Sequence, residues 1–389
     1  MPDRRLRLLL VTRNLPPLVG GMERLNWHMA EELAKVAEVR VIGPQGAAAV
    51  APAGIDVREA PLKPLWRFLL RAQRLARREA ASWKPEIVLA GSGLAAPLAW
   101  RAARACGARA AVYVHGLDVA IKHPLYRALW LPAIRRMQVV IANSQPTAAL
   151  CTQAGVDAAR IAIVHPGVEL PAAEPPGAPQ RRHDDGPDGF RQHHGLGNRP
   201  ILLSVGRLST RKGLREFVVQ ALPQIVAAHP DAMLLVIGDA PKQALHAQAQ
   251  SPESIQAAAE DTGVGGNLRF LGKVSDDVLI AAYRAADVHV FPVRELPGDP
   301  EGFGMVAVEA AAHGLPTVAF ATGGIVDAVA DGRSGRLVAS GDYPGFAVAV
   351  SQTLVHRDAL REACIDFAQG FAWPAFGGGV WAALRRKMD

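Results

Sequence analysis

The sequence has few cysteines and no long apolar segment. Cys106, Cys151 and Cys364 are far apart, odd in number and without C-x-x-C spacing, which argues against a disulfide framework or a structural zinc site and for a reducing cytoplasm. No apolar run approaches the roughly 18–20 residues that a membrane-spanning helix needs. The short apolar run at 6–11 is followed by Arg13 and Asn14, not by a small-residue cleavage site, so we expect a first β-strand rather than a signal peptide.

Acidic residues are scarce in the N-terminal half of the chain. Residues 1–180 hold 23 Lys and Arg against 13 Asp and Glu, the remainder holds 20 against 23, and the whole chain carries a net charge of +7. A basic half suggests an anionic partner, such as a phospholipid surface, a lipid-linked phosphate or a nucleic acid. The alternative is a basic face that only interacts with solvent. The length of 389 residues, half of them apolar, fits two globular domains.

Short apolar runs alternate with longer helical patterns along most of the chain. Strands are expected at 6–11, 39–43, 86–90, 110–114, 139–143, 201–205, 232–238, 268–271, 288–292 and 316–320. Helices are expected between them, among others at 22–33, 213–228, 276–286 and 305–313. This alternation predicts an α/β fold with parallel sheets covered by helices on both faces.

The pattern is lost over 171–199, which is rich in Pro, Gly and charge. We therefore predict two doubly wound, Rossmann-like domains, 1–172 and 200–370, joined by a linker or insertion at 173–199. His183, His193 and His194 lie in this segment near two aspartates. They could imitate a metal-binding cluster, but a solvated loop is the expectation.

Two short segments have the residue types of an anion site. In doubly wound sheets ligands bind beyond the carboxyl ends of the strands, and between two domains the cleft is the expected site. Gly20 and Gly21 stand before the first helix, where glycine lets an anion approach backbone N–H groups; a plain tight turn is the alternative. Arg207 and Lys212 follow the strand at 201–205. Two cations beside a helix N-terminus suit a diphosphate, and the alternative is a pair of exposed surface cations.

The stretch PEGFGMVAVEA at 300–310 places two carboxylates on a loop and the helix that follows it. Glu301 is at the loop tip, where it can accept hydrogen bonds from sugar hydroxyls while the amides of 302–304 donate to oxygens. Glu309 lies roughly 12 Å further along a helix, so it would address a different, diol-like group. The alternatives are helix-start electrostatics for Glu301 and a locally satisfied buried carboxylate for Glu309.

The order of these motifs resembles a known family. P-P-x₂-G-G-M-E at 16–23, H-G-L-D at 115–118, G-R-x₄-K-G at 206–213 and E-x₇-E at 301–309 look like a retaining nucleotide-sugar glycosyltransferase of family 4, with the GT-B fold. The resemblance covers nearly the whole chain, and 144–150, 165–169 and 270–293 also look like family segments. The loop before Glu301 is similar to that of the phosphatidylinositol mannosyltransferases.

The resemblance implies a role for each matching residue. Arg207 and Lys212 would hold the donor diphosphate and stabilise it as leaving group, in place of a divalent metal, since no Asp-x-Asp triplet occurs. Glu301 would bind hydroxyls of the transferred hexose, and Glu309 the ribose diol. His115 would sit over the reacting sugar.

Further positions are implied to assist in binding the donor. Asp118 would support His115; Gly302 and the amides of Phe303 and Gly304 would accompany Glu301. Gly21, with its neighbour Gly20, would approach the phosphates, and Lys273 and Val274 would lie along the base. The resemblance also implies front-face transfer with retention, no cofactor, and a C-terminal helix at 371–389 that returns to the first domain. Pro374 and the glycines at 377–379 weaken that helix, so only 380–388 is expected to be helical.

The acceptor should be recognised by the basic N-terminal domain. The segments 63–83 and 123–137 combine Trp, Leu and Arg, as basic amphipathic helices at a membrane interface do. The first has Trp66, Leu69, Leu70 and Leu75 on its apolar side. We expect a cytoplasmic enzyme, peripheral at the inner face of the membrane, with a lipid-linked or glycan acceptor in lipopolysaccharide or exopolysaccharide biosynthesis. The alternative is helices that pack an ordinary apolar stripe on the sheet.

Other functions remain open at this point. A nucleotide-sugar epimerase shares the two-domain fold, but no acid/base carboxylate cluster for proton abstraction from a sugar carbon is evident. A non-catalytic nucleotide-sugar binder is also compatible with the motifs. Nucleic acid is not expected as a partner, because the second half lacks aromatic residues interleaved with basic ones. For the donor, GDP-mannose is the first expectation, before UDP-linked hexoses or N-acetylhexosamines.

Overall fold

The computed structural model describes residues 5–171, 186–240 and 250–386. The chain forms two compact units. Unit 1 comprises Met1–Gly167, Gly298–Phe303 and Phe371–Asp389, and unit 2 comprises Val168–Pro297 and Gly304–Gly370. Residues 173–185 of the expected linker, with His183, lie outside the described residues.

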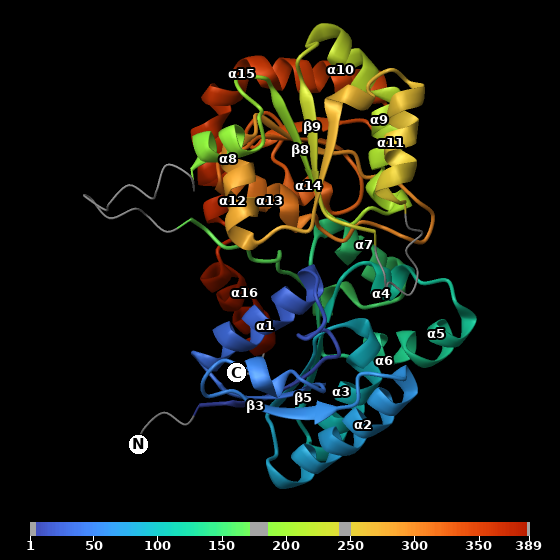
Figure 1. Ribbon diagram of the computed structural model, residues 1–389. Coiled ribbons are helices and arrows are strands. Elements are labelled where there is room, and N and C mark those ends of the chain that lie inside the picture. Colours follow the sequence, from blue (N-terminus) through green and yellow to red (C-terminus); the bar gives the residue numbers. More distant parts are fainter. Residues whose placement is uncertain (1–4, 172–185, 241–249, 387–389) are drawn as a thin grey trace, which may run out of the picture. The chain divides into compact units, whose positions relative to one another are not determined.

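Among the described residues, unit 1 is built on a seven-stranded parallel sheet with the strand order β3-β2-β1-β4-β5-β6-β7 (Figure 1). Its strands are β1 Arg7–Val11, β2 Glu38–Pro44, β3 Asp56–Ala60, β4 Ile87–Ala90, β5 Arg109–Val114, β6 Val139–Ala142 and β7 Ile161–Ile163. Leu8, Leu9, Leu10 and Val11 of β1 are all fully buried. Since successive side chains point to opposite faces, both faces of the sheet are covered.

Helices cover the unit 1 sheet on its two faces. They are α1 Gly21–Ala34, α2 Leu65–Ser82, α3 Ala96–Cys106, α4 Leu117–Ala120, α5 Pro124–Leu129, α6 Leu131–Arg135, α7 Gln145–Gln153 and α16 Trp373–Arg385, with 3₁₀ turns η1 Ala48–Val50, η2 Gly93–Ala95 and η3 Ala158–Arg160. Phe68 of α2 and Leu98 of α3 share a core with Leu9 and Val11. Helices α1 and α16 pack on each other (Figure 1), and His28 stacks on Trp373 at 4.1 Å between ring centroids.

In the described part of unit 2, a six-stranded parallel sheet has the order β10-β9-β8-β11-β12-β13. Its strands are β8 Ile201–Val205, β9 Met233–Ile237, β10 Leu268–Gly272, β11 Val288–Phe291, β12 Thr317–Phe320 and β13 Gly335–Val338. The helices are α8 Pro187–His193, α9 Leu214–Gln220, α10 Leu222–Ala228, α11 Pro252–Asp261, α12 Asp276–Ala285, α13 Met305–Ala312, α14 Ile325–Ala328 and α15 Tyr343–Gln369, with 3₁₀ turns η5 Thr210–Lys212 and η6 Gly265–Asn267. One core lies under α9, α10, α11 and α15, and another under α8, α12 and α13.

Several expected helices differ from the observed ones. The helix expected at 213–228 is divided into α9 and α10, with Pro223 in the first turn of α10. Proline fits there because the first N–H groups of a helix need no intrahelical partner. The segment 123–137 is likewise divided into α5 and α6 at Trp130. The last helix begins at Trp373 rather than 380 and includes Gly377 to Gly379, because Trp373, Phe376, Val380 and Leu384 bury one face of it.

The predicted linker 173–199 was wrong for its described part. Residues 187–193 form α8, and Phe190 and Leu196 are buried in the core of unit 2. The Arg191 guanidinium donates to the carbonyl oxygens of Gly197, Arg199 and Ala285. This segment is therefore an integral part of unit 2. Within the described residues, no helix combines the length and apolar character required to cross a membrane.

Candidate functional site

Each sheet reverses its strand order at one point, β1/β4 in unit 1 and β8/β11 in unit 2. Ligands of doubly wound sheets bind beyond the carboxyl ends of the strands at such points. The loop after β1 leads to Gly20 and Gly21, and the loop after β8 carries Arg207 and Lys212. The topology thus places the predicted anion-binding residues of each unit at its own switch point.

In unit 1, His115 is fixed at the end of β5. Its backbone N–H donates to Asp118 Oδ2 at 2.9 Å, and its ring Nε2 lies 3.0 Å from the Gly91 carbonyl oxygen at the end of β4. Gly116 has φ +87°, which favours glycine. The side chain of Asp118 is in turn held against Gly93, where a Cβ would lie 2.7 Å from its own Cβ. The structure thus brings the His115 backbone and the Asp118 carboxylate together.

The stretch 298–303 packs against this part of unit 1 and not, as the predicted domain 200–370 required, with unit 2. A Cβ at Gly302 would lie 2.5 Å from the His115 carbonyl oxygen and 2.7 Å from Asn143 Nδ2. Only a residue without a side chain allows this approach. Glu301, half-buried, is therefore next to a residue in direct backbone contact with His115.

A cluster of rings holds the end of the same stretch. Phe303 is 3% exposed, and its ring centroid lies 5.3 Å from that of His165 and 5.7 Å from that of Phe371. His165 follows β7, Phe303 is the last residue of the 298–303 stretch, and Phe371 is the first residue of the C-terminal segment of unit 1. Aromatic packing therefore fixes Phe303, and with it the position of Gly302 and Glu301.

At the start of α1, the carboxylate of Glu23 lies close to Gly20. A Cβ at Gly20 would lie 2.5 Å from Glu23 Oε2, and Asn14 Nδ2 donates to Glu23 Oε1 at 2.9 Å. Burial lowers the pKa of the nearby Arg13, and the Glu23 charge partly offsets this. Gly20 and Gly21 are exposed, so an anion can reach this helix start, where it would meet Glu23 as well as the amides.

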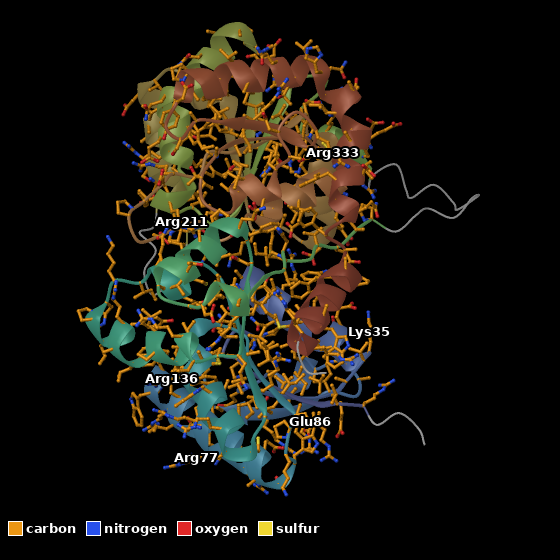
Figure 2. The ribbon with its side chains drawn as sticks, turned by 180° about the vertical axis from the view of Figure 1, so that it is seen from behind. Lys35, Arg77, Glu86, Arg136, Arg211 and Arg333 are labelled. Carbon is orange, nitrogen blue, oxygen red and sulfur yellow. The ribbon has the colours of Figure 1, made fainter. Side chains whose placement is uncertain are left out.

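In unit 2, glycines bring two loops into contact beneath the predicted diphosphate site. Gly206 and Gly238 have φ +144° and +138°, and a Cβ at Gly238 would lie 1.9 Å from the Gly206 carbonyl oxygen. Arg207 follows directly and is exposed, whereas Lys212 ends η5 and is half-buried. Figure 2 labels the neighbouring Arg211, whose carbonyl oxygen accepts the Arg294 N–H at 2.8 Å.

Lys212 is held over an aromatic ring. Its Nζ lies 4.6 Å from the centroid of Phe291, the last residue of β11, within cation–π range. The ring edge is also close to Gly304, where a Cβ would lie 2.8 Å from Phe291 Cε1. Phe291 thus contacts both Lys212 and the residue that precedes α13. In the sequence, Phe291 stands out only as an aromatic residue at the end of a predicted strand, and the motifs do not include it.

A buried histidine lies behind this ring. His289 of β11 is fully buried, its Nδ1 lies 3.0 Å from Thr317 Oγ1, and its ring stacks on Phe291 at 5.6 Å. Burial and the Lys212 charge lower the pKa of His289 to about 3. The His289 imidazole is therefore neutral near pH 7. Lys212 thus carries the positive charge of this pair of residues.

The remaining predicted residues of unit 2 lie on α13 and directly after β10. Glu309 is half-buried on α13 and accepts from Tyr283 Oη at 3.3 Å, a local partner that the sequence did not reveal. Lys273 is exposed and Val274 half-buried, directly after β10. Among the described residues, no group of three or more His, Cys, Asp or Glu side chains is arranged to hold a metal ion.

Comparison with known proteins assigns the class. Residues 188–371 match the model of the glycosyl transferases group 1, and residues 19–171 match that of glycosyltransferase family 4. The chain is 30% identical over 377 residues, 93% of its length and 92% of the relative's, to a GDP-mannose-dependent α-(1-6)-phosphatidylinositol monomannoside mannosyltransferase of Mycolicibacterium smegmatis. The chain therefore belongs to the family 4 glycosyltransferases, which decides between this class and the epimerase or binder alternatives.

Two further comparisons refine the picture. A D-inositol 3-phosphate glycosyltransferase of Segniliparus rotundus is 33% identical over 253 residues, which are 64% of this chain and 52% of that protein. The crystal structure of Anabaena HepE in complex with UDP superposes with a TM-score of 0.79, at 20% identity and over 98% of this chain and 100% of that one. The predicted GT-B fold, with its two parallel sheets, is thereby confirmed.

Proposed function

We propose that this glycosyltransferase transfers mannose, with retention, from GDP-mannose to a lipid-linked or glycan acceptor in the synthesis of cell-envelope glycolipid or polysaccharide. The observation that carries the proposal is the pair of cations, Arg207 and Lys212, at the β8/β11 switch point of a chain that is 30% identical to a GDP-mannose-dependent mannosyltransferase over 93% of its length. The GDP-mannose dependence of the relative supports guanine as the base and mannose as the sugar. The two cations support a diphosphate in the donor.

The donor would be held mainly by unit 2. Arg207 and Lys212 would bind the diphosphate, and Phe291 would keep the Lys212 ammonium in place. Glu309 would bind the ribose diol; its bond to the Tyr283 hydroxyl leaves further lone pairs on the carboxylate. Lys273 and Val274 would lie along the base, in keeping with their place after β10.

The transferred sugar would be held by the stretch that packs on His115. Glu301 would accept hydrogen bonds from hexose hydroxyls, and backbone amides at 302–304 would donate to sugar oxygens. His115 would lie over the reacting sugar, with Asp118 fixing its backbone. Support comes from the contact between Gly302 and the His115 carbonyl oxygen, which couples the positions of the two residues.

Charge develops on two groups during the transfer. The bond from the anomeric carbon to the donor phosphate oxygen breaks, the acceptor hydroxyl oxygen bonds to that carbon on the same face, and its proton passes to the departing phosphate. Positive charge grows on the sugar and negative charge on the diphosphate, where fixed cations lower the barrier. Arg207 and Lys212 would take the part that a divalent metal has in other enzymes.

Unit 1 would recognise the acceptor and contact the membrane peripherally. On α2, Trp66 and Leu70 are 57% and 54% exposed, and the Arg67 guanidinium lies 5.2 Å from the Trp66 ring centroid. Leu75, by contrast, packs in the core, so the membrane contact is proposed only for the face of the helix that carries Trp66 and Leu70. In the view of Figure 2, Arg77 and Arg136 lie on the side of unit 1 that α2 and α6 form. An exposed Trp and Leu among arginines suit an anionic bilayer surface.

UDP-glucose is the second candidate donor, because HepE, which shares the fold, is known in complex with UDP-glucose. The test is a thermal-shift panel of GDP-mannose, UDP-glucose, UDP-N-acetylglucosamine, GDP and UDP with the wild type and Arg207→Ala. A ligand that binds only the folded state raises the melting temperature. We expect a shift with GDP-mannose and GDP that Arg207→Ala abolishes; a shift with uridine nucleotides alone would replace the donor, and none at all would refute the diphosphate site.

A further inference from the structure

A second group of arginines lines a groove on β2 and β3, at the edge of the unit 1 sheet. The groove lies between β2, β3 and α2 and has a volume of about 530 Å³. Four arginines line it, namely Arg40, Arg58, Arg71 and Arg78. Val57 and Leu75 also contribute. A concave site of this size accommodates a small molecule.

The carboxylates of the groove are already engaged by the protein. Glu79 is 5% exposed; its Oε2 accepts from Arg40 Nη1 at 2.7 Å, and its Oε1 lies 3.6 Å from Arg58 Nε. Glu59 Oε1 accepts the backbone N–H groups of Gly46 and Ala48, both at 2.9 Å. Arg40 is also 4.4 Å from the Trp83 ring centroid. These bonds fix the walls of the groove. They also pair the carboxylates of Glu79 and Glu59 with donors from the protein itself.

Two arginines are left without such partners. Within the described part of the chain, the guanidinium groups of Arg71 and Arg78 have neither an ion pair nor a hydrogen bond. They are seven residues apart on α2, so both lie on the stripe that contains Leu75, roughly 10 Å from each other along the helix axis. Two guanidiniums at this spacing in a concave site can each donate a forked pair of hydrogen bonds to an oxyanion.

We propose that this groove binds a phosphate-bearing anion, with Arg71 and Arg78 as its primary ligands and Arg40 and Arg58 as the charged wall behind them. Arginine is suited to planar, bidentate recognition of phosphate oxygens. The site lies on β2, β3 and α2, whereas the proposed donor and sugar residues follow β5, β8, β10 and β11. It is therefore a site separate from glycosyl transfer, and it stands or falls independently of the proposed function.

The test is a calorimetric titration with pyrophosphate at low ionic strength. All proteins carry Arg207→Gln and Lys212→Gln, so that the proposed donor site does not contribute. The groove variant adds Arg71→Gln and Arg78→Gln to this background. The matched control adds Arg74→Gln and Arg77→Gln instead. The control removes the same charge from the same helix, but from side chains outside the groove.

We expect the control to bind pyrophosphate like its parent, and the groove variant to bind at least tenfold more weakly. Equal weakening in both variants would show a diffuse charge effect and overturn the proposal, as would a parent that binds nothing. Arg71→Lys with Arg78→Lys keeps the charge but not the fork, and we expect intermediate affinity. Unchanged melting temperatures check that the fold is retained.

A second arm distinguishes the source of the phosphate. Sedimentation with phosphatidylglycerol-containing vesicles is compared with and without saturating pyrophosphate. If the groove binds lipid headgroups, pyrophosphate and the groove variant both release the protein from vesicles. If vesicle binding persists in both cases while pyrophosphate still binds, the ligand is a free phosphate compound, and the exposed Trp66 side of α2 accounts for the membrane contact.

Discussion

Arg191 and Asp287 are 96 residues apart in the sequence, and their Nη2 and Oδ2 atoms lie 3.1 Å apart in unit 2. The Asp287 side chain is only 4% exposed. It also accepts the Ile201 N–H at 2.7 Å and pairs with Arg357. One buried carboxylate therefore connects α8, β8 and α15.

Replacing Arg191 with alanine should destabilise the protein substantially. The change removes the donor to three backbone carbonyls and leaves Asp287 with Arg357 as its remaining charged partner, so we expect a loss of about 2–4 kcal/mol in the free energy of unfolding. Urea denaturation measures it. Arg215→Ala, on the exposed side of α9, is the control and should change stability by less than about 0.5 kcal/mol.

Lys212→Ala should weaken nucleotide-diphosphate binding by about 10–100-fold, because a charge-assisted hydrogen bond to phosphate is worth about 1.5–3 kcal/mol. Phe291→Leu keeps Lys212 but removes the ring below its ammonium, so we expect a smaller loss of affinity. Equilibrium titration of GDP and GDP-mannose measures both variants. An unchanged affinity in Lys212→Ala would contradict the assigned role.

Gly302→Ala should reduce transfer activity far more than donor binding. Its Cβ would stand 2.5 Å from the His115 carbonyl oxygen, so the stretch must move, and misplacement by about 1 Å costs up to about 100-fold in rate. The kinetic constants kcat and KM separate the two effects. Gly266→Ala, where a Cβ meets no atom within 4 Å, is the control; equal losses in both variants would refute the argument.

Neighbouring glycines of α16 should respond in opposite directions. Gly378→Ala adds a Cβ that meets nothing within 4 Å, whereas a Cβ at Gly377 would lie 2.3 Å from that of Glu32. Alanine is the better helix former by about 0.5–1 kcal/mol, so Gly378→Ala should raise the melting temperature. Gly377→Ala should lower it by separating α16 from α1.

Stability should fall on acidification, partly through His289. Its pKa is about 3 in the folded protein against 6.5 in the reference state, so below pH 6.5 the unfolded chain binds the additional proton, and stability falls as the pH falls towards 3. The slope for one site is at most about 1.4 kcal/mol per pH unit. Urea denaturation at pH 7 and pH 5 should show a smaller difference for His289→Asn than for the wild type. His356→Asn, exposed on α15, should leave the difference unchanged.

The strands were largely predictable, because buried parallel strands are nearly continuous apolar runs, as in β1 and β8. Strands such as β3, with the sequence DVREA, lack that signal, since they lie at a sheet edge. Likewise α8 depends on Arg191 reaching Asp287, a contact that no local pattern encodes. The helical continuity of 377–379 comes from burial against α1, which outweighs glycine's low propensity.

For the candidate site, the residue types and their order were predictable, but their surroundings were not. Arg207 and Lys212 could be found because they follow a strand, whereas His115 could be found only from the order of the family motifs. The packing of 298–303 on His115 could not, since it depends on a backbone approach at Gly302. Phe291 and Tyr283 were missed because a strand-final aromatic and a helical tyrosine have the same pattern as ordinary core residues.

The contact between Gly206 and Gly238 limits how this enzyme can be re-engineered. Any side chain at 238 would collide with the Gly206 carbonyl oxygen, so the close approach of these two turns requires glycine at this position whichever donor is bound. Attempts to change nucleotide preference should therefore leave both glycines untouched and vary exposed positions such as Lys273, which is proposed to lie along the base.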